Sequence, residues 1–326
     1  MSRLRLAWLF ASTIAVTAAI FFLAGAQMSG RAEPSAQVEV ADAALDPHAG
    51  HLQPAYASQA AGAISVPDDG RLPPSSEGAK ARLERTPRHG EWVDIPVSGS
   101  PVPLRTWVAY PERRDKAPVA ILIHTIYGLN DGMRGIADQM ALEGFIAVVP
   151  DMVSGRGPGG GGTESAHSRD DLPVMVRGLT PADVTARLDA VFAYAKAIPA
   201  ANGKIATVGF CWGGTMSFAY ATTQPALGAA IVYYGTSPET GRLAAINAPV
   251  LGLYGSDDAR VNVTIDPAKV EMRKRGKVFE TNIYEGAGHG FLGSQADRSG
   301  ANLKATQQAW PTTIAFLRKH LGESGS

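Results

Sequence analysis

A single cysteine stands at the centre of a glycine-rich turn, Gly-Phe-Cys-Trp-Gly-Gly, at residues 209–214. Residues 204–210 form an apolar run that predicts a short buried strand, and residues 215–221 predict the start of a helix. A strand, a sharp turn and a helix, with glycine two positions before and after the central residue, are typical of a nucleophile elbow. Glycine is required because side chains would clash where strand and helix cross. Cys211 therefore stands where an elbow usually has serine, since G-x-S-x-G occurs nowhere in the chain.

A carboxylate and a histidine follow the elbow in the chain order nucleophile, acid, histidine. The apolar run 249–254 ends in Gly-Ser-Asp-Asp, and a carboxylate in such a turn can orient a histidine. We favour Asp258 because it completes a G-x-x-D pattern with an apolar residue three positions later, and Asp257 is the alternative. His289 follows the last apolar run, 277–284, and lies between glycines, in a loop from which an imidazole can reach a thiol.

Strand and helix patterns alternate along the chain. Residues 92–97 and 104–110 alternate like an antiparallel pair, whereas residues 119–123 are continuously apolar, as expected of a central parallel strand. Further strands are predicted at 145–150 and 229–234. Thr-Pro-Ala-Asp at residues 180–183 predicts the N-cap and first turn of a helix that ends near residue 197. The pattern indicates an α/β chain with a mostly parallel, doubly wound sheet, helices on both faces and a site at the carboxyl ends of the strands.

Four segments resemble the dienelactone hydrolase family, the cysteine branch of the α/β-hydrolases: residues 124–130, 209–214, 254–258 and 285–291. The resemblance covers roughly residues 91–320 and implies the α/β-hydrolase fold and hydrolysis of a small ester or lactone. It implies a triad of Cys211, His289 and Asp258, and an oxyanion hole made by the backbone N–H groups of Ile126 and Trp212. No metal or organic cofactor is expected.

Four side chains are candidates for the pocket wall: His124, Thr125, Tyr127 and Phe291. His124 either faces the pocket or is a structural histidine at a strand end. Family members commonly have Glu where this chain has Thr125, and that Glu is thought to help ionise the thiol. Either the thiolate depends here on His289 and the helix N-terminus, or the activity is weakened or altered.

A second departure from the family concerns the substrate. Members that cleave dienelactones hold the substrate carboxylate with arginines, one of them just after the histidine–phenylalanine segment. Here residues 291–295 are Phe-Leu-Gly-Ser-Gln, and the next arginine is Arg298. We therefore expect general ester hydrolysis rather than cleavage of a dienelactone.

Composition narrows the classes of partner. The chain of 326 residues has 30 Lys and Arg against 30 Asp and Glu, so it lacks the basic footprint that nucleic-acid binding requires. One cysteine excludes an intramolecular disulfide and any cysteine-based zinc site. Residues 155–162 are glycine-rich but lack the G-K-[ST] ending of a phosphate-binding loop, so we expect a flexible loop near the pocket mouth.

The N-terminal residues predict a targeting segment and a spacer. Residues 1–26 combine Arg3 and Arg5 with a long apolar run that ends in Ala-Gly-Ala, typical of a signal peptide. An uncleaved membrane anchor is the alternative, and either places the domain outside the cytoplasm, periplasmic or secreted. Residues 27–90 are rich in Ala, Gly, Ser and Pro and predict a disordered spacer, followed by the hydrolase domain at 91–322.

Two functions follow from these observations. The first is an exported hydrolase that cleaves an ester or lactone through the Cys-His-Asp triad and a covalent thioester. The second is a non-catalytic α/β-hydrolase-like protein, tethered by its N-terminus, that binds a small molecule or a protein. Thr125 in place of Glu supports the second, and the complete triad supports the first.

Overall fold

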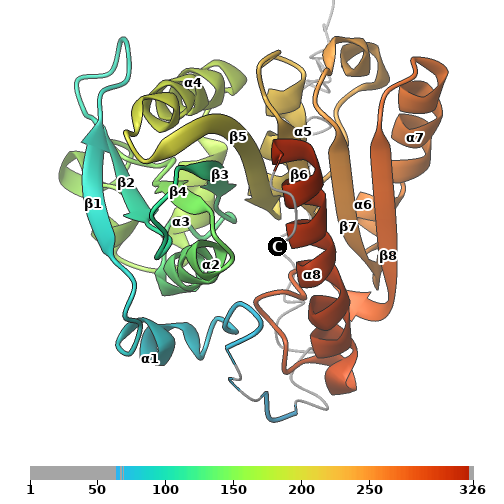
Figure 1. Cartoon of the computed structure of the whole chain (residues 1–326), viewed down its shortest axis with the longest axis horizontal. Helices are drawn as coiled ribbons and strands as arrows, with labels where there is room; N and C mark the ends of the chain where they lie inside the picture. The colour runs from blue at the N-terminus through green and yellow to red at the C-terminus, as the bar shows by residue number, and fades with distance from the viewer. Residues whose placement is uncertain (1–63, 67, 69, 323–326) are drawn as a thin grey trace, which may run out of the picture. The chain divides into compact units, whose positions relative to one another are not determined.

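An eight-stranded mixed sheet forms the centre of the fold in the computed structural model, which describes residues 64–66, 68 and 70–322. The strand order is β1-β2-β4-β3-β5-β6-β7-β8 (Figure 1). β2 pairs antiparallel with both β1 and β4, and the other neighbours are parallel. The strands are β1 Gly90–Ile95, β2 Leu104–Ala109, β3 Ala117–Ile123, β4 Ile146–Pro150, β5 Ala201–Phe210, β6 Ala229–Tyr233, β7 Val250–Asp257 and β8 Phe279–Gly288.

Helices cover both faces of the sheet. In Figure 1, α8 crosses in front of β6 while α5 lies behind it. α8 also reaches α2, because the Trp310 indole donates to Glu143, at the end of α2. The helices are α1 Ala79–Leu83, α2 Asp131–Leu142, α3 Asp171–Arg177, α4 Pro181–Ala197, α5 Trp212–Ala221, α6 Ala259–Asn262, α7 Ile265–Lys274 and α8 Ala301–Leu321.

The predicted α/β-hydrolase fold is confirmed. Every residue of β3, β4 and β6 is buried, as expected of strands covered by helices on both sides. Thr180 and Asp183 cap α4 reciprocally: the Asp183 amide donates to the Thr180 hydroxyl, and the Asp183 carboxylate accepts from the Thr180 amide. No helix was predicted at α3, α6 or α7. With seven and four residues, α3 and α6 are too short to show a helical period.

The segment before β1 differs from the prediction. Within the stretch predicted to be a spacer, the structure places residues 70–90 against the domain, and α1 packs on α2. Polar anchoring replaces apolar periodicity here: Arg88 makes two hydrogen bonds to Asp138, and Arg82 donates to Gln139. The spacing of apolar residues therefore could not predict that this segment packs against the domain.

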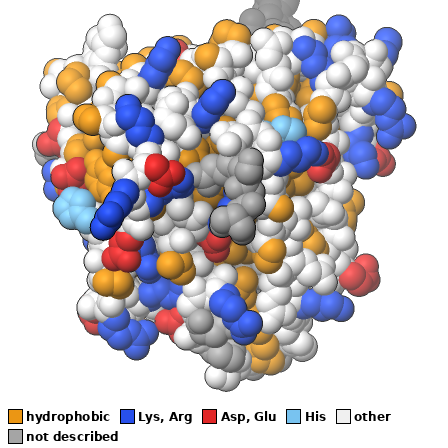
Figure 2. Space-filling model, in the orientation of Figure 1, with side chains coloured by type: hydrophobic (Ala, Val, Ile, Leu, Met, Phe, Trp, Pro, Cys, Tyr) orange, Lys and Arg blue, Asp and Glu red, His pale blue; other side chains and the backbone are white. Residues whose placement is uncertain are grey.

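The targeting prediction for residues 1–26 lies outside the described residues, as do residues 27–63. Among the helices that the structure does describe, none combines the length and apolar character needed to span a bilayer. On the face shown in Figure 2, basic side chains are interspersed with acidic ones, consistent with the balanced net charge of the chain.

Candidate active site

Cys211 lies on a strained turn between β5 and α5. Its backbone φ of 58° is in the left-handed region, which residues other than glycine rarely adopt. A Cβ at Gly209 would lie 1.9 Å from the carbonyl oxygen of Gly213, and one at Gly213 would lie 2.1 Å from that of Ile123. The three glycines of this turn are therefore steric requirements, since Gly214 likewise leaves only 2.6 Å to the Tyr233 carbonyl oxygen. This is the geometry of the elbow expected from the sequence.

His289 lies between an acid and the thiol. Its Nδ1 is 2.6 Å from Oδ2 of Asp258, which is largely buried at the start of α6. Cys211 and His289 line one pocket, and hydrogen bonding between them contributes to the electrostatics of the imidazole. The structure thus brings together the three side chains predicted from three separate segments.

The charges around His289 favour its protonated form. Burial by itself lowers the pKa of His289, but the charge of Cys211 and the hydrogen bonds to Asp258 and Cys211 outweigh burial and raise it to about 9. An imidazolium paired with a thiolate and held by a carboxylate is the arrangement that keeps a cysteine nucleophilic near neutral pH.

The neighbouring Asp257 has a different partner. Its carboxylate is mostly exposed and forms an ion pair with Arg298. Two adjacent aspartates therefore point to separate partners, and only Asp258 reaches His289.

The loop after β3 faces the elbow. Thr125 accepts a hydrogen bond from the Tyr127 amide through its hydroxyl, 3.1 Å, and another from the Gly128 amide through its carbonyl, 3.2 Å. This tight turn places Ile126 in the pocket wall. Trp212 begins α5, where the first backbone N–H groups have no partner within the helix and carry partial positive charge.

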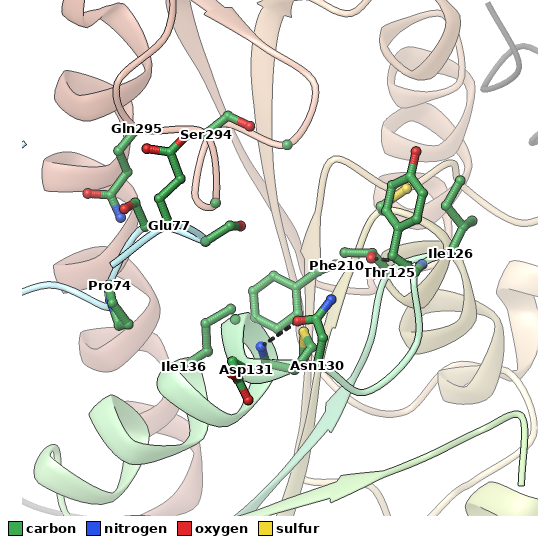
Figure 3. Close-up of a pocket in the computed structure, with 18 of the residues that line it drawn as sticks. Pro74, Glu77, Thr125, Ile126, Asn130, Asp131, Ile136, Phe210, Ser294 and Gln295 are labelled. Carbon is green, nitrogen blue, oxygen red and sulfur yellow. Dashed lines mark hydrogen bonds between the residues drawn. The ribbon is translucent and has the colours of Figure 1, made fainter. Parts of the chain in front are cut away.

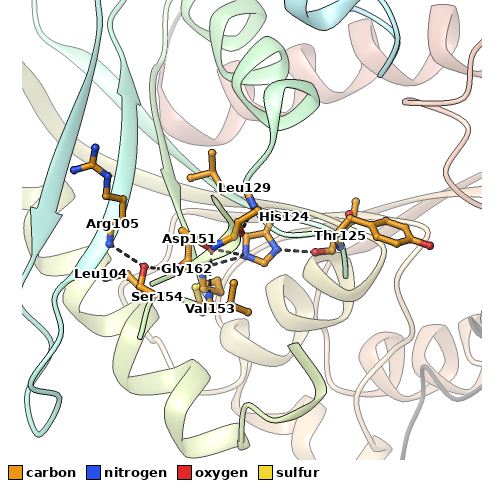
Figure 4. A network of polar contacts seen from close by, with 12 residues as sticks. Leu104, Arg105, His124, Thr125, Leu129, Asp151, Val153, Ser154 and Gly162 are labelled. Carbon is orange, nitrogen blue, oxygen red and sulfur yellow. Dashed lines mark hydrogen bonds and ion pairs between the residues drawn. The ribbon is translucent and has the colours of Figure 1, made fainter. Parts of the chain in front are cut away.

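His124 lies behind the pocket, and it does not line it. Its Nδ1 is 2.6 Å from the Thr125 carbonyl oxygen, and its Nε2 accepts from the Met152 amide at 3.0 Å (Figure 4). Because Nε2 is an acceptor, the ring is neutral with its proton on Nδ1, and burial lowers the pKa of His124. Of the two roles left open by the sequence, the structural one holds.

The glycine-rich loop is anchored through the residues beside it. Buried Asp151 accepts from both the amide and the hydroxyl of Thr163, each at 2.7 Å, and the Thr163 hydroxyl accepts from the Leu129 amide. This network joins the loop to the turn at Thr125. Residues 155–162 do not line the pocket, but Thr163 and Glu164 do.

Phe291 also lies behind the pocket, which corrects its prediction as a wall residue. It is fully buried, and its ring packs against Tyr233, Tyr234 and Tyr284. Tyr234 lines the pocket instead, and its ring centroid is 5.1 Å from that of His289. Tyr234 directly follows β6 and has a φ of 42°. Its position at the carboxyl end of a predicted central strand is the feature of the sequence that could have identified it as a pocket residue.

The pocket has a volume of about 820 Å³ and is drawn in Figure 3. Thr125 and Tyr127 line it as predicted, and the guanidinium of Arg169 lies 4.0 Å from the centre of the Tyr127 ring. One part of its wall was not expected: residues 74–77, from the segment before β1, lie against residues 293–297. Within the described ranges, no group of three or more His, Cys, Asp and Glu side chains could hold a metal ion.

Comparison with known proteins identifies the family. The model of the dienelactone hydrolase family matches residues 104–321, which is most of the chain. The chain belongs to the dienelactone hydrolase family. It is accordingly a hydrolase that acts on ester or lactone bonds.

Three similar proteins each align with about 70% of the chain. A Salmonella typhimurium protein named as a carboxymethylenebutenolidase is 29% identical over 250 residues, covering 72% of this chain and 88% of the relative. A Bradyrhizobium protein named as a 2-oxo-3-(5-oxofuran-2-ylidene)propanoate lactonase is 27% identical, covering 71% and 94%. The structure of a Klebsiella pneumoniae protein named as a dienelactone hydrolase superposes with a TM-score of 0.63 at 26% identity, covering 72% of this chain and all of that one.

Proposed function

We propose that this dienelactone hydrolase family member cleaves a carboxylic ester or lactone with Cys211 as its nucleophile. The observation that carries the proposal is the arrangement around His289, which lies 2.6 Å from Asp258 and shares the pocket wall with Cys211. Asp258 orients the imidazole and stabilises its charge, and His289 transfers the proton.

Acylation begins at the carbonyl carbon of the ester. The Cys211 thiolate forms the bond to carbon, and the carbonyl oxygen becomes an oxyanion that accepts hydrogen bonds from the Ile126 and Trp212 amides. The positive end of α5 favours the same negative charge. When the tetrahedral species collapses, the alkoxide leaves with the proton of the His289 imidazolium, and Cys211 is left as a thioester.

Deacylation reverses these roles with water. Neutral His289 removes a proton from a water molecule, whose oxygen attacks the thioester carbon. The carbonyl oxygen again becomes an oxyanion at the same two amides. Collapse releases the carboxylic acid and the Cys211 thiolate, and His289 keeps the proton, so the resting ion pair is restored.

Thr125 takes no part in activating the thiol in this proposal. Its hydroxyl and carbonyl already accept hydrogen bonds from the turn, so it shapes the loop that presents Ile126. Ionisation of Cys211 then depends on His289 and on the helix N-terminus. Export is part of the proposal as well, and it rests on the signal-like composition of residues 1–26.

Hydrolysis of short p-nitrophenyl esters and of a small lactone panel tests the proposal. We expect the Cys211→Ala variant to fall to the uncatalysed rate, and mass spectrometry of the wild type to detect an acyl group on Cys211. A variant that retains full activity would assign the chemistry to another group.

The two adjacent aspartates offer a matched control. Asp258→Asn should lower kcat by about 10²- to 10⁴-fold because His289 loses the carboxylate that orients it. Asp257→Asn removes only an exposed ion pair and should leave kcat within about twofold. Equal effects of the two substitutions would contradict the assignment of Asp258.

A further inference from the structure

Residues 72–77 form a strap across one side of the pocket. The Ser76 amide donates to the Gly293 carbonyl at 2.9 Å, and Gln295 donates to the Pro73 carbonyl at 2.9 Å. At its start the strap is held by Arg82, which donates to the Leu72 carbonyl at 2.7 Å. The strap is thus bonded to the loop that directly follows His289, and it lies outside the residues matched by the family model.

The strap contributes to the end of the pocket remote from the oxyanion loop. Figure 3 shows Glu77, Ser294 and Gln295 together on the side opposite Thr125 and Ile126. A substrate whose carbonyl lies between Cys211 and the Ile126 amide would therefore extend its far end towards Glu77.

Carboxylates dominate the charge of the pocket wall. The charged lining residues, apart from His289, are Glu77, Asp131, Glu164, Asp297 and Arg169. Arg169 lies over Tyr127 on the oxyanion-loop side, and Asp131 is paired with Arg134. Burial raises the pKa of Asp297 and the charge of Glu77 raises it further, so these two carboxylates are close enough to repel each other. Arg298 acts in the opposite direction on Asp297, but it is itself paired with Asp257.

We propose that the strap is a specificity element, and that Glu77 and Asp297 make the enzyme prefer esters with a neutral or cationic far end over esters ending in a carboxylate. The inference rests on the proposed function and adds the substrate class. Glu77 is exposed and Asp297 is half-buried, so a carboxylate brought beside them meets like charge at the rim of the pocket, whereas a trimethylammonium group is attracted.

Three phenyl esters test the charge preference. Their acyl chains have equal length and end in a methyl, a carboxylate or a trimethylammonium group. The wild type should show a higher kcat/KM for the neutral and cationic esters than for the anionic one. In the Glu77→Gln, Asp297→Asn double variant this ratio should fall about five- to tenfold, and high salt should reduce the wild-type ratio.

Glu84→Gln is the matched control. Glu84 is an exposed carboxylate at the end of α1, a few residues along the chain, and it does not line the pocket. Its substitution should leave the ratio unchanged. A wild type that prefers the anionic ester, or a double variant with the wild-type ratio, would overturn the proposal.

Alkylation of the thiol separates this inference from the proposed function. Cys211 is the single cysteine, and it can be alkylated by two N-substituted iodoacetamides whose tails end in a carboxylate (N-(5-carboxypentyl)iodoacetamide) or a methyl group (N-hexyliodoacetamide). Each forms a carbon bond to the sulfur and releases iodide. The two reagents have similar size and differ in charge. The double variant should raise the rate of the carboxylate-ended reagent relative to the methyl-ended one about threefold. This result stands even if no ester is hydrolysed, and an unchanged ratio would contradict the role of Glu77 and Asp297.

Discussion

At the residue scale, Cys211 and Asp258 both favour the protonated form of His289. A buried imidazole alone would favour its neutral form, since burial disfavours charge. Here negative groups lie on both sides of the ring, and the pKa of His289 rises to about 9. These partners limit the cost of holding a charged imidazolium away from water.

The raised pKa predicts a pH profile. We expect kcat/KM to fall as the pH rises through about 9, because His289 then loses the proton that the leaving group needs. The stabilisation that this proton gives the fold should be complete below the ordinary pKa of 6.5 and be lost towards pH 9. Ester hydrolysis assays at a series of pH values measure kcat/KM, and thermal unfolding at the same pH values measures the stability.

Asp258→Asn supplies the control for that profile. Without the carboxylate, the pKa of His289 should be lower, so the alkaline limb of the residual activity should move to lower pH. A profile that stays level past pH 9, or a limb that does not move in the variant, would contradict the ion pair.

At the scale of elements, the crossing of β5 and α5 depends on the absence of side chains. Gly209→Ala would place a Cβ 1.9 Å from the Gly213 carbonyl oxygen. The nearest atoms all belong to the backbone of Gly213 and Gly214, so no side chain can rotate to relieve the clash. We expect a loss of about 3–5 kcal/mol in the free energy of unfolding, measured by urea denaturation.

Gly241→Ala is the matched substitution. Gly241 lies in the short 3-10 helix Thr240–Ala245, and a Cβ there would meet nothing within 4 Å. Its free energy of unfolding should change by less than about 0.5 kcal/mol. Similar losses in the two variants would show that the elbow glycines are not sterically required.

On the scale of the whole described chain, the segment before β1 is tied to the domain by buried charge. Arg88 bonds Asp138 at 2.8 and 2.7 Å, and the two side chains are only 12% and 4% exposed. Arg88→Ala leaves a buried carboxylate without its guanidinium, and should lower the free energy of unfolding by about 3 kcal/mol.

Arg275→Ala provides the comparison for Arg88. Arg275 pairs with Glu271 four positions earlier, and its side chain is 41% exposed. Losing this surface pair should cost less than about 1 kcal/mol in the same urea denaturation measurement. If Arg88→Ala were equally mild, the segment would not depend on that ion pair.

Local patterns in the sequence determined much of the fold and of the site. The cap at Thr180 and Asp183, the continuous apolar runs, and the requirement for glycine at position 209 are each decided by residues nearby in the sequence, through hydrogen bonding, burial or sterics. The order of Cys211, Asp258 and His289 along the chain was also readable, since each follows a predicted strand.

Tertiary structure alone decided which groups meet. The sequence could not place His124 and Phe291 behind the wall, because each is held there by a partner distant in the chain, His124 by Met152 and Phe291 by Tyr233. Nor could it show that Glu77 meets the loop after His289. The physical reason is range: sterics and capping act between neighbours in sequence, whereas packing and buried hydrogen bonds join residues that only the folded chain brings together.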